Sequence, residues 1–381
     1  MPHPIDLTVA PLDELLRRRS EKGAGCAPGV LSSTIAEMDF PLAAPVADAL
    51  RGAIGRSDLG YASEAIPELA AAFTDFAARR LNWRVDPAQV SVIPDVMVGV
   101  GALATVLAGD ARAVAFASPA YPPFFGNPPR AGLDVRPVPL RDGGELDLDA
   151  LHAELATGTT VFLLANPHNP TGRVLPRAEL EAIAETCAAH DAWVLADEIH
   201  APLVLPGAVH TPWLEVSDAA RERGVSLISA SKAFNLAGLK AALLVTASDR
   251  ARDVVAGLPP LSDHTGLLGV LGAEAAFAHG DAWLDAVLAQ LDHNRTLLGE
   301  LLATALPDVR WTPPEGTYLA WLDCRALGLG DDPSAAFLER GRVALGTGPR
   351  YGAEGAGFVR LNFGTSPELV EEAVRRMAAT L

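Results

Sequence analysis

The stretch VFLLANPHNPTGRVLPRAELEAIAETCAAHDAWVLADEIH, residues 161–200, carries the pattern that decides the fold. It begins and ends with short apolar runs, Val161–Leu164 and Trp193–Ala196, which suit strands buried on both faces. Between the two runs, Arg177–His190 has apolar residues at the i, i+3, i+4 and i+7 positions of an amphipathic helix. A strand, helix and strand at this spacing predict a βαβ unit with parallel strands.

The same pattern extends outward along the chain. Further apolar runs of four or five residues occur at Ala113–Ala117, Val225–Ile228 and Ala241–Val245. They predict an α/β fold with a mostly parallel sheet. Beyond Pro259-Pro260 the pattern changes to long helical stretches and two late strands, which indicates a second, smaller α+β unit. We therefore expect an N-terminal arm (1–40) that packs with the small domain, a large domain (41–265) and a small domain (266–381).

The composition excludes several classes of function. Of 381 residues, 47 are acidic and 30 are basic, and the net charge of −17 disfavours binding to nucleic acid or anionic lipid through bulk charge. Cys26, Cys187 and Cys324 are too few and too scattered for a disulfide framework. The segment Met1–Leu15 has no basic region followed by an apolar run, so no secretion signal is expected. We predict a cytoplasmic protein without membrane spans.

Polar side chains follow three of the predicted strands. In open α/β sheets, ligands bind beyond the carboxyl ends of the strands, so residues at these positions share one edge. Asn169, Asp197 and Lys232 bring an amide, a carboxylate and an amine to that edge. These are the groups that a pyridoxal phosphate site requires. The segments that follow the runs at 161–164, 193–196 and 225–228 are Asn166–Arg173, Asp197–His200 and Ser229–Lys240.

Each of these groups has a plain structural alternative, since a lone lysine is usually solvated and a lone aspartate often caps a helix. Three of them in order at matching strand ends favour the cofactor site. A carboxylate about 4 Å from the protonated ring nitrogen attracts it by roughly 4 kcal/mol at an effective dielectric near 20. Asp197 is the candidate for that partner. Lys232 is the candidate for the imine-forming amine and for the general base at the substrate α-carbon.

Arg360 is a second independent candidate. The stretch FVRLNF, residues 358–363, has a period of two, so that Arg360 and Asn362 point away from the apolar face of a strand. An arginine in this position needs an anion, and a carboxylate is the natural bidentate partner. The sequence leaves open whether that carboxylate belongs to a substrate or to a structural ion pair.

These motifs together resemble a known family. The order NPHNPTG (166–172), ADEIH (196–200), SASKAFNLAGLK (229–240) and FVRLNFG (358–364) is similar to that of the fold-type I pyridoxal phosphate enzymes, the class I/II aminotransferase superfamily. The resemblance covers about Ala36 to the C-terminus. It implies the fold-type I architecture, with a seven-stranded-type, mostly parallel sheet in a large domain and a smaller α+β domain at the C-terminus.

Four pieces resemble one branch of that superfamily, the C–S β-lyases of the MalY/PatB type, which include cystathionine β-lyases. They are AEMDF (36–40), Gly60-Tyr61, SPAYPPFF (118–125) and NPHNPTGRV (166–174) followed by DEIH (197–200). In the last piece His200 replaces the tyrosine usual in aminotransferases. The resemblance implies α,β-elimination of a cysteine S-conjugate such as cystathionine to thiol, pyruvate and ammonia. An aminotransferase of L-amino acids and a regulatory protein that retains the fold are the alternatives.

The resemblance also implies roles for individual residues. Tyr61 reaches the phosphate in the neighbouring subunit, which implies a homodimer with shared sites, and Arg360 grips the substrate carboxylate. No metal is expected, because no Cys, His and acidic residues have metal-ligand spacing. The catalytic set is Lys232, Asp197 and Tyr61; the cofactor set is Lys232, Asp197, Asn169, Tyr121, His200, Ser229, Ser231, Lys240, Val96, Met97 and Tyr61; the substrate set is Arg360, Asn169 and Tyr121.

Several positions, Asp95, Glu37, Thr171 and Lys240, depart from the family pattern, and Asp95 bears most directly on the cofactor. Asp95 stands where the family has the glycine of a Pro-Gly turn, just before the helix whose amides hold the phosphate. The predicted helix over Val96–Ala108 is retained. The aspartate either caps this helix or lowers the affinity for the phosphate, and the sequence leaves both open.

Overall fold

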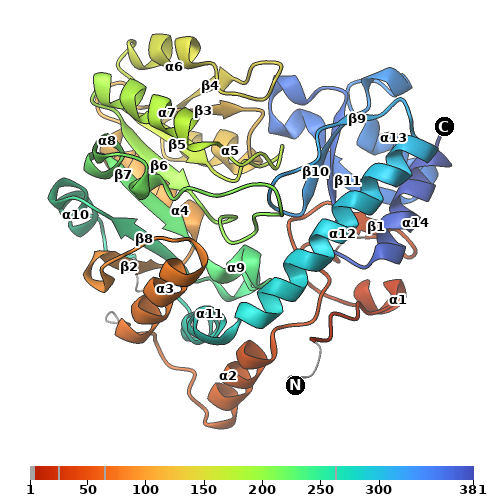
Figure 1. Ribbon diagram of the computed structural model, residues 1–381, viewed down its shortest axis with the longest axis horizontal. Coiled ribbons are helices and arrows are strands. Elements are labelled where there is room, and N and C mark those ends of the chain that lie inside the picture. Colours follow the sequence, from red (N-terminus) through yellow and green to blue (C-terminus); the bar gives the residue numbers. More distant parts are fainter. Residues whose placement is uncertain (1–4, 25, 64–65, 262–263) are drawn as a thin grey trace.

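The computed structural model describes residues 5–24, 26–63, 66–261 and 264–381, and it contains two sheets (Figure 1). The larger sheet has seven strands in the order β2-β8-β7-β6-β5-β3-β4. All its strands run parallel except β8, which pairs antiparallel with both neighbours. The predicted α/β class and mostly parallel sheet are confirmed. The strands are β2 (Val90–Ile93), β3 (Ala113–Ser118), β4 (Asp134–Pro139), β5 (Val161–Ala165), β6 (Trp193–Asp197), β7 (Gly224–Ile228) and β8 (Ala242–Thr246).

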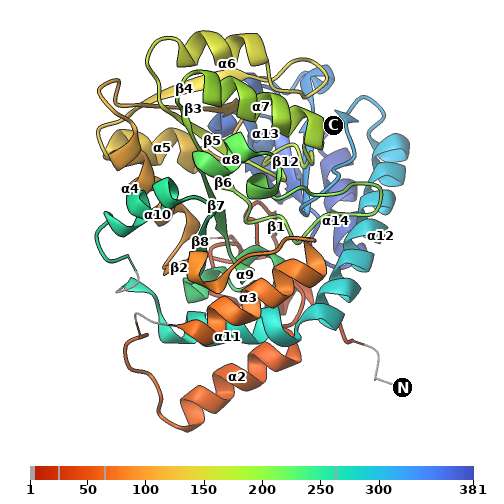
Figure 2. The same ribbon diagram turned by 60° about the vertical axis from the view of Figure 1, so that its left-hand side comes forward.

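Helices cover both faces of this sheet (Figure 2). Along β5, Val161 and Leu163 join one apolar cluster, whereas Phe162 and Leu164 join the other. This alternation explains why the central strands are apolar throughout. The first cluster includes residues of α4 (Val96–Leu107), α5 (Pro122–Arg130) and α10 (Asp249–Ala256). The second includes residues of α3 (Pro67–Arg80), α6 (Leu148–Leu155), α7 (Arg177–Ala189), α8 (Asp218–Glu222), α9 (Ala230–Ala233) and α11 (Leu267–His279).

Helix α4 packs closely on the sheet at Gly99. A Cβ atom at this position would lie 2.6 Å from Ile93 Cδ1 and 2.8 Å from Leu227 Cδ2. A larger residue there would displace these two side chains or the helix. The contact therefore holds the N-terminus of α4 at a defined place beside the strand ends.

The smaller sheet has five strands in the order β1-β11-β12-β10-β9. Its edge strand β1 comes from the N-terminal arm and pairs in parallel with β11. The expected division at residues 40 and 265 stays a prediction, and α11 packs on α2 (Ala44–Gly55) and α3. The remaining elements are α1 (Leu12–Leu15), β1 (Leu31–Ser33), α12 (Asp281–Ala305), β9 (Arg310–Trp311), β10 (Leu319–Asp323), α13 (Pro333–Gly341), β11 (Val343–Thr347), β12 (Phe358–Asn362) and α14 (Pro367–Ala378).

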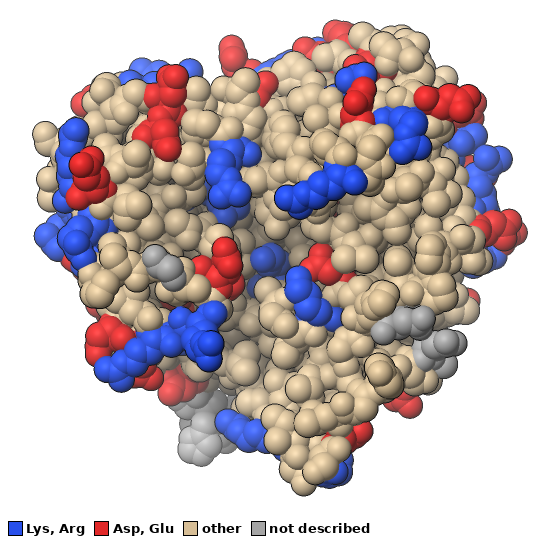
Figure 3. Space-filling view, turned by 180° about the vertical axis from the view of Figure 1, so that it is seen from behind, with Lys and Arg blue, Asp and Glu red and all other residues tan. Residues whose placement is uncertain are grey.

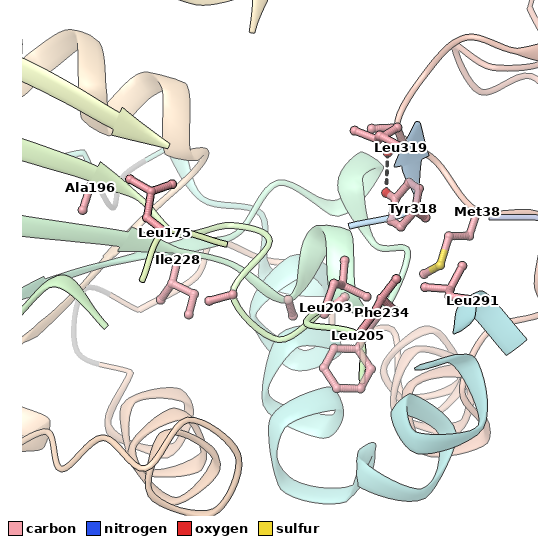
Figure 4. Packing of buried hydrophobic residues seen from close by; sticks show 14 of the residues in the cluster. Met38, Leu175, Ala196, Leu203, Leu205, Ile228, Phe234, Leu291, Tyr318 and Leu319 are labelled. Atoms are coloured by element: carbon pink, nitrogen blue, oxygen red, sulfur yellow. Dashed lines mark hydrogen bonds between the residues drawn. The ribbon is translucent and has the colours of Figure 1, made fainter. Parts of the chain in front are cut away.

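One apolar cluster joins the two sheets. Figure 4 shows Met38 of the arm beside Leu291 of α12 and Tyr318, with Phe234 and Ile228 on the side of the larger sheet. All five side chains are buried. The cluster thus fixes β12 relative to the strand ends of the larger sheet. Within the described part of the chain, no helix combines the length and the apolar character needed to cross a membrane.

Candidate active site

A cavity of about 210 Å³ lies beyond the carboxyl ends of β5, β6 and β7. One face of the molecule is hollowed near its centre, with basic and acidic side chains around the hollow (Figure 3). Tyr61 does not line the cavity, and its side chain is 99% exposed. All other predicted site residues line it. They are Val96, Met97, Tyr121, Asn169, Asp197, His200, Ser229, Ser231, Lys232, Lys240 and Arg360.

Asp197 is the last residue of β6 and is buried. Its Oδ1 accepts a hydrogen bond from the Ile199 N–H at 3.2 Å. Burial raises the pKa of its carboxyl to about 7, and the charge of Lys232 opposes this rise. A cation that approached the carboxylate in the cavity would favour its ionised form.

Lys232 lies on the short helix α9, directly after β7. Its Nζ donates a hydrogen bond to the Ala36 carbonyl at 2.9 Å. Burial, and next the positive charge of Arg360, lower the pKa of the amine to about 8. About a tenth of the amine is therefore neutral at pH 7, far more than for an ordinary lysine, and the neutral amine is the form that acts as a nucleophile or base.

Arg360 projects from β12 into the cavity, as the period of two predicts. Its two terminal nitrogens donate to Asn169 Oδ1 at 2.9 Å and to the Thr34 carbonyl at 2.7 Å. Its Nε is buried and has no hydrogen-bond partner among the described residues. No carboxylate in the described ranges forms an ion pair with Arg360. The geometry thus favours an external anion over a structural ion pair.

The residues expected at the phosphate gather at one end of the cavity. Ser229 Oγ donates to the Ala241 carbonyl at 2.7 Å and accepts from the Ser231 N–H at 3.0 Å. Asp95 is the N-cap of α4, which confirms one of the two readings of this residue, and its carboxylate also pairs with Lys240 at 2.8 Å.

Tyr121 is the residue just before α5 and lines the cavity. Burial raises the pKa of its hydroxyl to about 12.

His200 lines the cavity with its ring 6.0 Å from that of Tyr318. Burial, together with the charges of Lys232 and Arg360, lowers the pKa of the imidazole well below its usual value, so His200 is neutral. Its Nδ1 is buried without a hydrogen-bond partner in the described part of the protein. A buried polar atom of this kind normally has a partner, so a bound molecule is expected to supply one.

Sequence reasoning missed the part played by the segment 34–37, whose carbonyls bond to side chains in and around the site. Tyr318 donates its hydroxyl to the Ala36 carbonyl at 2.8 Å, beside the bond from Lys232. Asn362 Nδ2 donates to the carbonyls of Ile35 at 2.6 Å and Glu37 at 2.7 Å. The shared face of Arg360 and Asn362 was a usable signal for Asn362. No local pattern marks backbone carbonyls as site groups.

The donor set fits pyridoxal phosphate. An acid and an amine with shifted pKa values face one cavity, and the unpaired His200 Nδ1 and Arg360 Nε give two further polar contacts for a bound molecule. Amide donors of the α4 N-terminus, two serines and Lys240 stand at one end, as an anionic group requires. In the described ranges no three His, Cys, Asp or Glu side chains gather as a metal site would need.

Comparisons with known proteins agree with this reading. A Mycobacterium tuberculosis protein provisionally named cystathionine beta-lyase is 41% identical over 408 residues, covering 100% of this chain and 99% of that protein. The cystathionine beta-lyase of Corynebacterium glutamicum is 33% identical over 97% of this chain and 99% of its own. A crystal structure from Corynebacterium diphtheriae, provisionally assigned as a PLP-dependent beta-cystathionase, has a TM-score of 0.92 at 34% identity and covers 98% of this chain and 99% of that one. The model of the aminotransferase class I and II family matches residues 35–377, and the chain belongs to this family.

Proposed function

We propose that the protein is a pyridoxal phosphate-dependent C–S β-lyase that cleaves a cysteine S-conjugate such as cystathionine to a thiol, pyruvate and ammonia. The observation that carries the proposal is the convergence of Lys232, Asp197 and Arg360 on one cavity at the strand ends. The relatives named cystathionine beta-lyase, at 33–41% identity over nearly the whole chain, support the reaction type.

Each side chain of the site has a separate role in the proposed reaction. Arg360, with Nε free, binds the substrate α-carboxylate, and Asn169 holds its guanidinium in place. Asp197 and Tyr121 line the cavity. With pyridoxal phosphate bound, Asp197 would hold the ring nitrogen in its protonated form and Tyr121 would pack on the ring. Lys232 would hold the cofactor and, as a free amine, would take the α-proton of the substrate on Nζ. Bound pyridoxal phosphate supplies the electron sink for the pair left on the α-carbon.

The Ala36 carbonyl determines the position of Lys232 Nζ, the proposed base. Its carbonyl accepts hydrogen bonds from both Lys232 Nζ and the Tyr318 hydroxyl. The amine is therefore held at one position at the edge of the cavity. This positioning favours proton transfer at one atom of a bound substrate.

The reaction is tested with purified protein, cystathionine and no keto acid. Elimination needs no second substrate, so pyruvate is expected to accumulate, and a coupled lactate dehydrogenase assay measures it. Lys232→Ala is expected to abolish the signal because the amine that takes the α-proton is gone. Pyruvate that forms only after a keto acid is added, or never forms, contradicts the lyase proposal.

An aminotransferase is the second candidate, favoured by the family model. It shares the residues that bind the amino acid and take its α-proton, so the requirement for a keto acid separates the two reactions. A regulatory protein that retains the fold is the third candidate. Such a protein acting through its surface would keep its effect after Lys232→Ala, whereas an enzyme would lose its activity.

We further propose a homodimer in which Tyr61 serves the partner's site. Tyr61 is 99% exposed and the neighbouring Leu59 is 59% exposed, so both side chains are available to a second copy. A tyrosine and a leucine this exposed are typical of a surface that is covered on assembly. We propose a cytoplasmic location, which is supported by three cysteines that form no disulfide.

A further inference from the structure

Asp95 stands at the end of the cavity where the anion-binding groups gather. It is the N-cap of α4, with its Oδ1 accepting from the Met97 N–H at 2.8 Å. Its Oδ2 accepts from Lys240 Nζ at 2.8 Å. One carboxylate thus engages both a free amide of the helix N-terminus and a nearby cation.

These two donors are also the ones that a phosphate at this end requires. The N-terminus of α4 carries partial positive charge and unpaired N–H groups, which bind anions. Lys240 lines the cavity together with Ser229 and Ser231, and Ser229 Oγ bonds to the carbonyl of the next residue, Ala241. A carboxylate and a phosphate therefore compete for the same amide and the same ammonium.

We propose that Asp95 is an internal competitor for the cofactor phosphate, and that it lowers the affinity of the site for pyridoxal phosphate. The inference rests on the proposed cofactor site. When the phosphate binds, the Asp95 carboxylate loses its hydrogen bond from the Met97 N–H and its ion pair with Lys240. It then remains as a negative charge close to the negative phosphate. Asp95 makes no hydrogen bond with Lys232 or Asp197 and acts on them only through its charge, so the largest part of the cost falls on the phosphate end.

Partial exposure limits the size of the effect. The side chain of Asp95 is 31% exposed and that of Lys240 is 60% exposed, so water screens their interaction. The carboxylate also stabilises the fold by capping α4. The chain thus gains a capped helix and a neutralised lysine, and it loses cofactor affinity.

The test compares full-length wild-type protein and Asp95→Asn, each stripped of cofactor and titrated with pyridoxal phosphate or with pyridoxal, which lacks the phosphate. Asparagine caps a helix about as well as aspartate, so α4 is retained. Removing the charge is expected to lower the dissociation constant for pyridoxal phosphate by about three- to fivefold. The dissociation constant for pyridoxal is expected to change less than about twofold. Absorbance of the bound cofactor gives both constants.

Asp147→Asn is the matched control. Asp147 is the N-cap of α6 and pairs with Arg141 at 3.2 Å, outside the cavity. Like Asp95→Asn, this variant removes the charge of a helix-capping carboxylate that has a cationic partner. It is expected to leave the dissociation constants for pyridoxal phosphate and pyridoxal unchanged. Inorganic phosphate is expected to raise the melting temperature of Asp95→Asn more than that of the wild type.

The outcomes separate this inference from the proposed function. An unchanged or higher dissociation constant for pyridoxal phosphate in Asp95→Asn overturns the inference, and so does an equal gain for pyridoxal. Failure of both wild type and variant to bind pyridoxal phosphate overturns the proposed function itself. Tighter binding confined to the phosphorylated compound supports both.

Discussion

Lys232 is held in surroundings that favour its neutral form. Burial lowers the pKa of its amine from 10.5 to about 8, and Arg360 acts in the same direction. The neutral amine attacks the aldehyde, so the rate at which stripped protein takes up pyridoxal phosphate is expected to rise with pH and level off above about 8. Stopped-flow absorbance across pH 6 to 11 measures this rate. A rate that still climbs steeply above pH 9.5 would contradict the lowered pKa.

At the scale of residues, the sequence predicted three of the site residues but not one of the ion pairs at the site. Asp197, Lys232 and Arg360 were identified from strand ends and from a period of two, and all three line one cavity. Their roles in catalysis remain predictions. The Asp95–Lys240 ion pair was beyond sequence reasoning, because it joins positions on two separate segments whose approach depends on how α4 packs against the sheet.

At the scale of elements, β12 holds the arm across the site. Asn362 is buried, and besides its two bonds to arm carbonyls its Oδ1 accepts from the Gly364 N–H at 2.7 Å. Asn362→Ala removes three hydrogen bonds and leaves the Gly364 N–H without its partner, whereas the Ile35 and Glu37 carbonyls keep their bonds from the Glu37 N–H and Lys22. The expected loss is roughly 1–3 kcal/mol in the free energy of unfolding. Urea denaturation followed by circular dichroism measures this loss.

A surface variant provides the comparison for that experiment. Arg51 lies on α2, and its ion pair with Asp48 is exposed at both ends. Arg51→Ala is expected to change the free energy of unfolding by less than about 0.5 kcal/mol. Equal effects of Asn362→Ala and Arg51→Ala would show that the arm is not held by Asn362.

Most elements were predictable because their signals are local. Helix α7 was expected over Arg177–His190 and spans Arg177–Ala189, and the run Val161–Leu164 became β5. Strand β1 had no such signal. It has only three residues, Leu31–Ser33, and its pairing with β11 is a contact between opposite ends of the chain.

At the scale of the whole molecule, the proposed dimer makes the two active sites interdependent. If Tyr61 serves the partner's site, Tyr61→Ala and Lys232→Ala are each inactive alone, and co-expression places both defects in one site of a mixed dimer. The other site is then intact, so about a quarter of wild-type activity is expected from random pairing. Pyruvate release by the co-purified mixture measures it. Activity no higher than that of the single variants would place Tyr61 outside the partner's site.

The sequence by itself determined the fold class, the order of the elements and the groups at the strand ends, since strand and helix periodicity and the residue after a strand are local properties of the chain. Only the tertiary structure decided that carbonyls of the segment 34–37 hold Lys232 and Arg360, and that Asp95 engages Lys240. These contacts join segments far apart in the chain, and they exist because the arm packs into the cluster that joins the two sheets while α4 packs on the larger sheet.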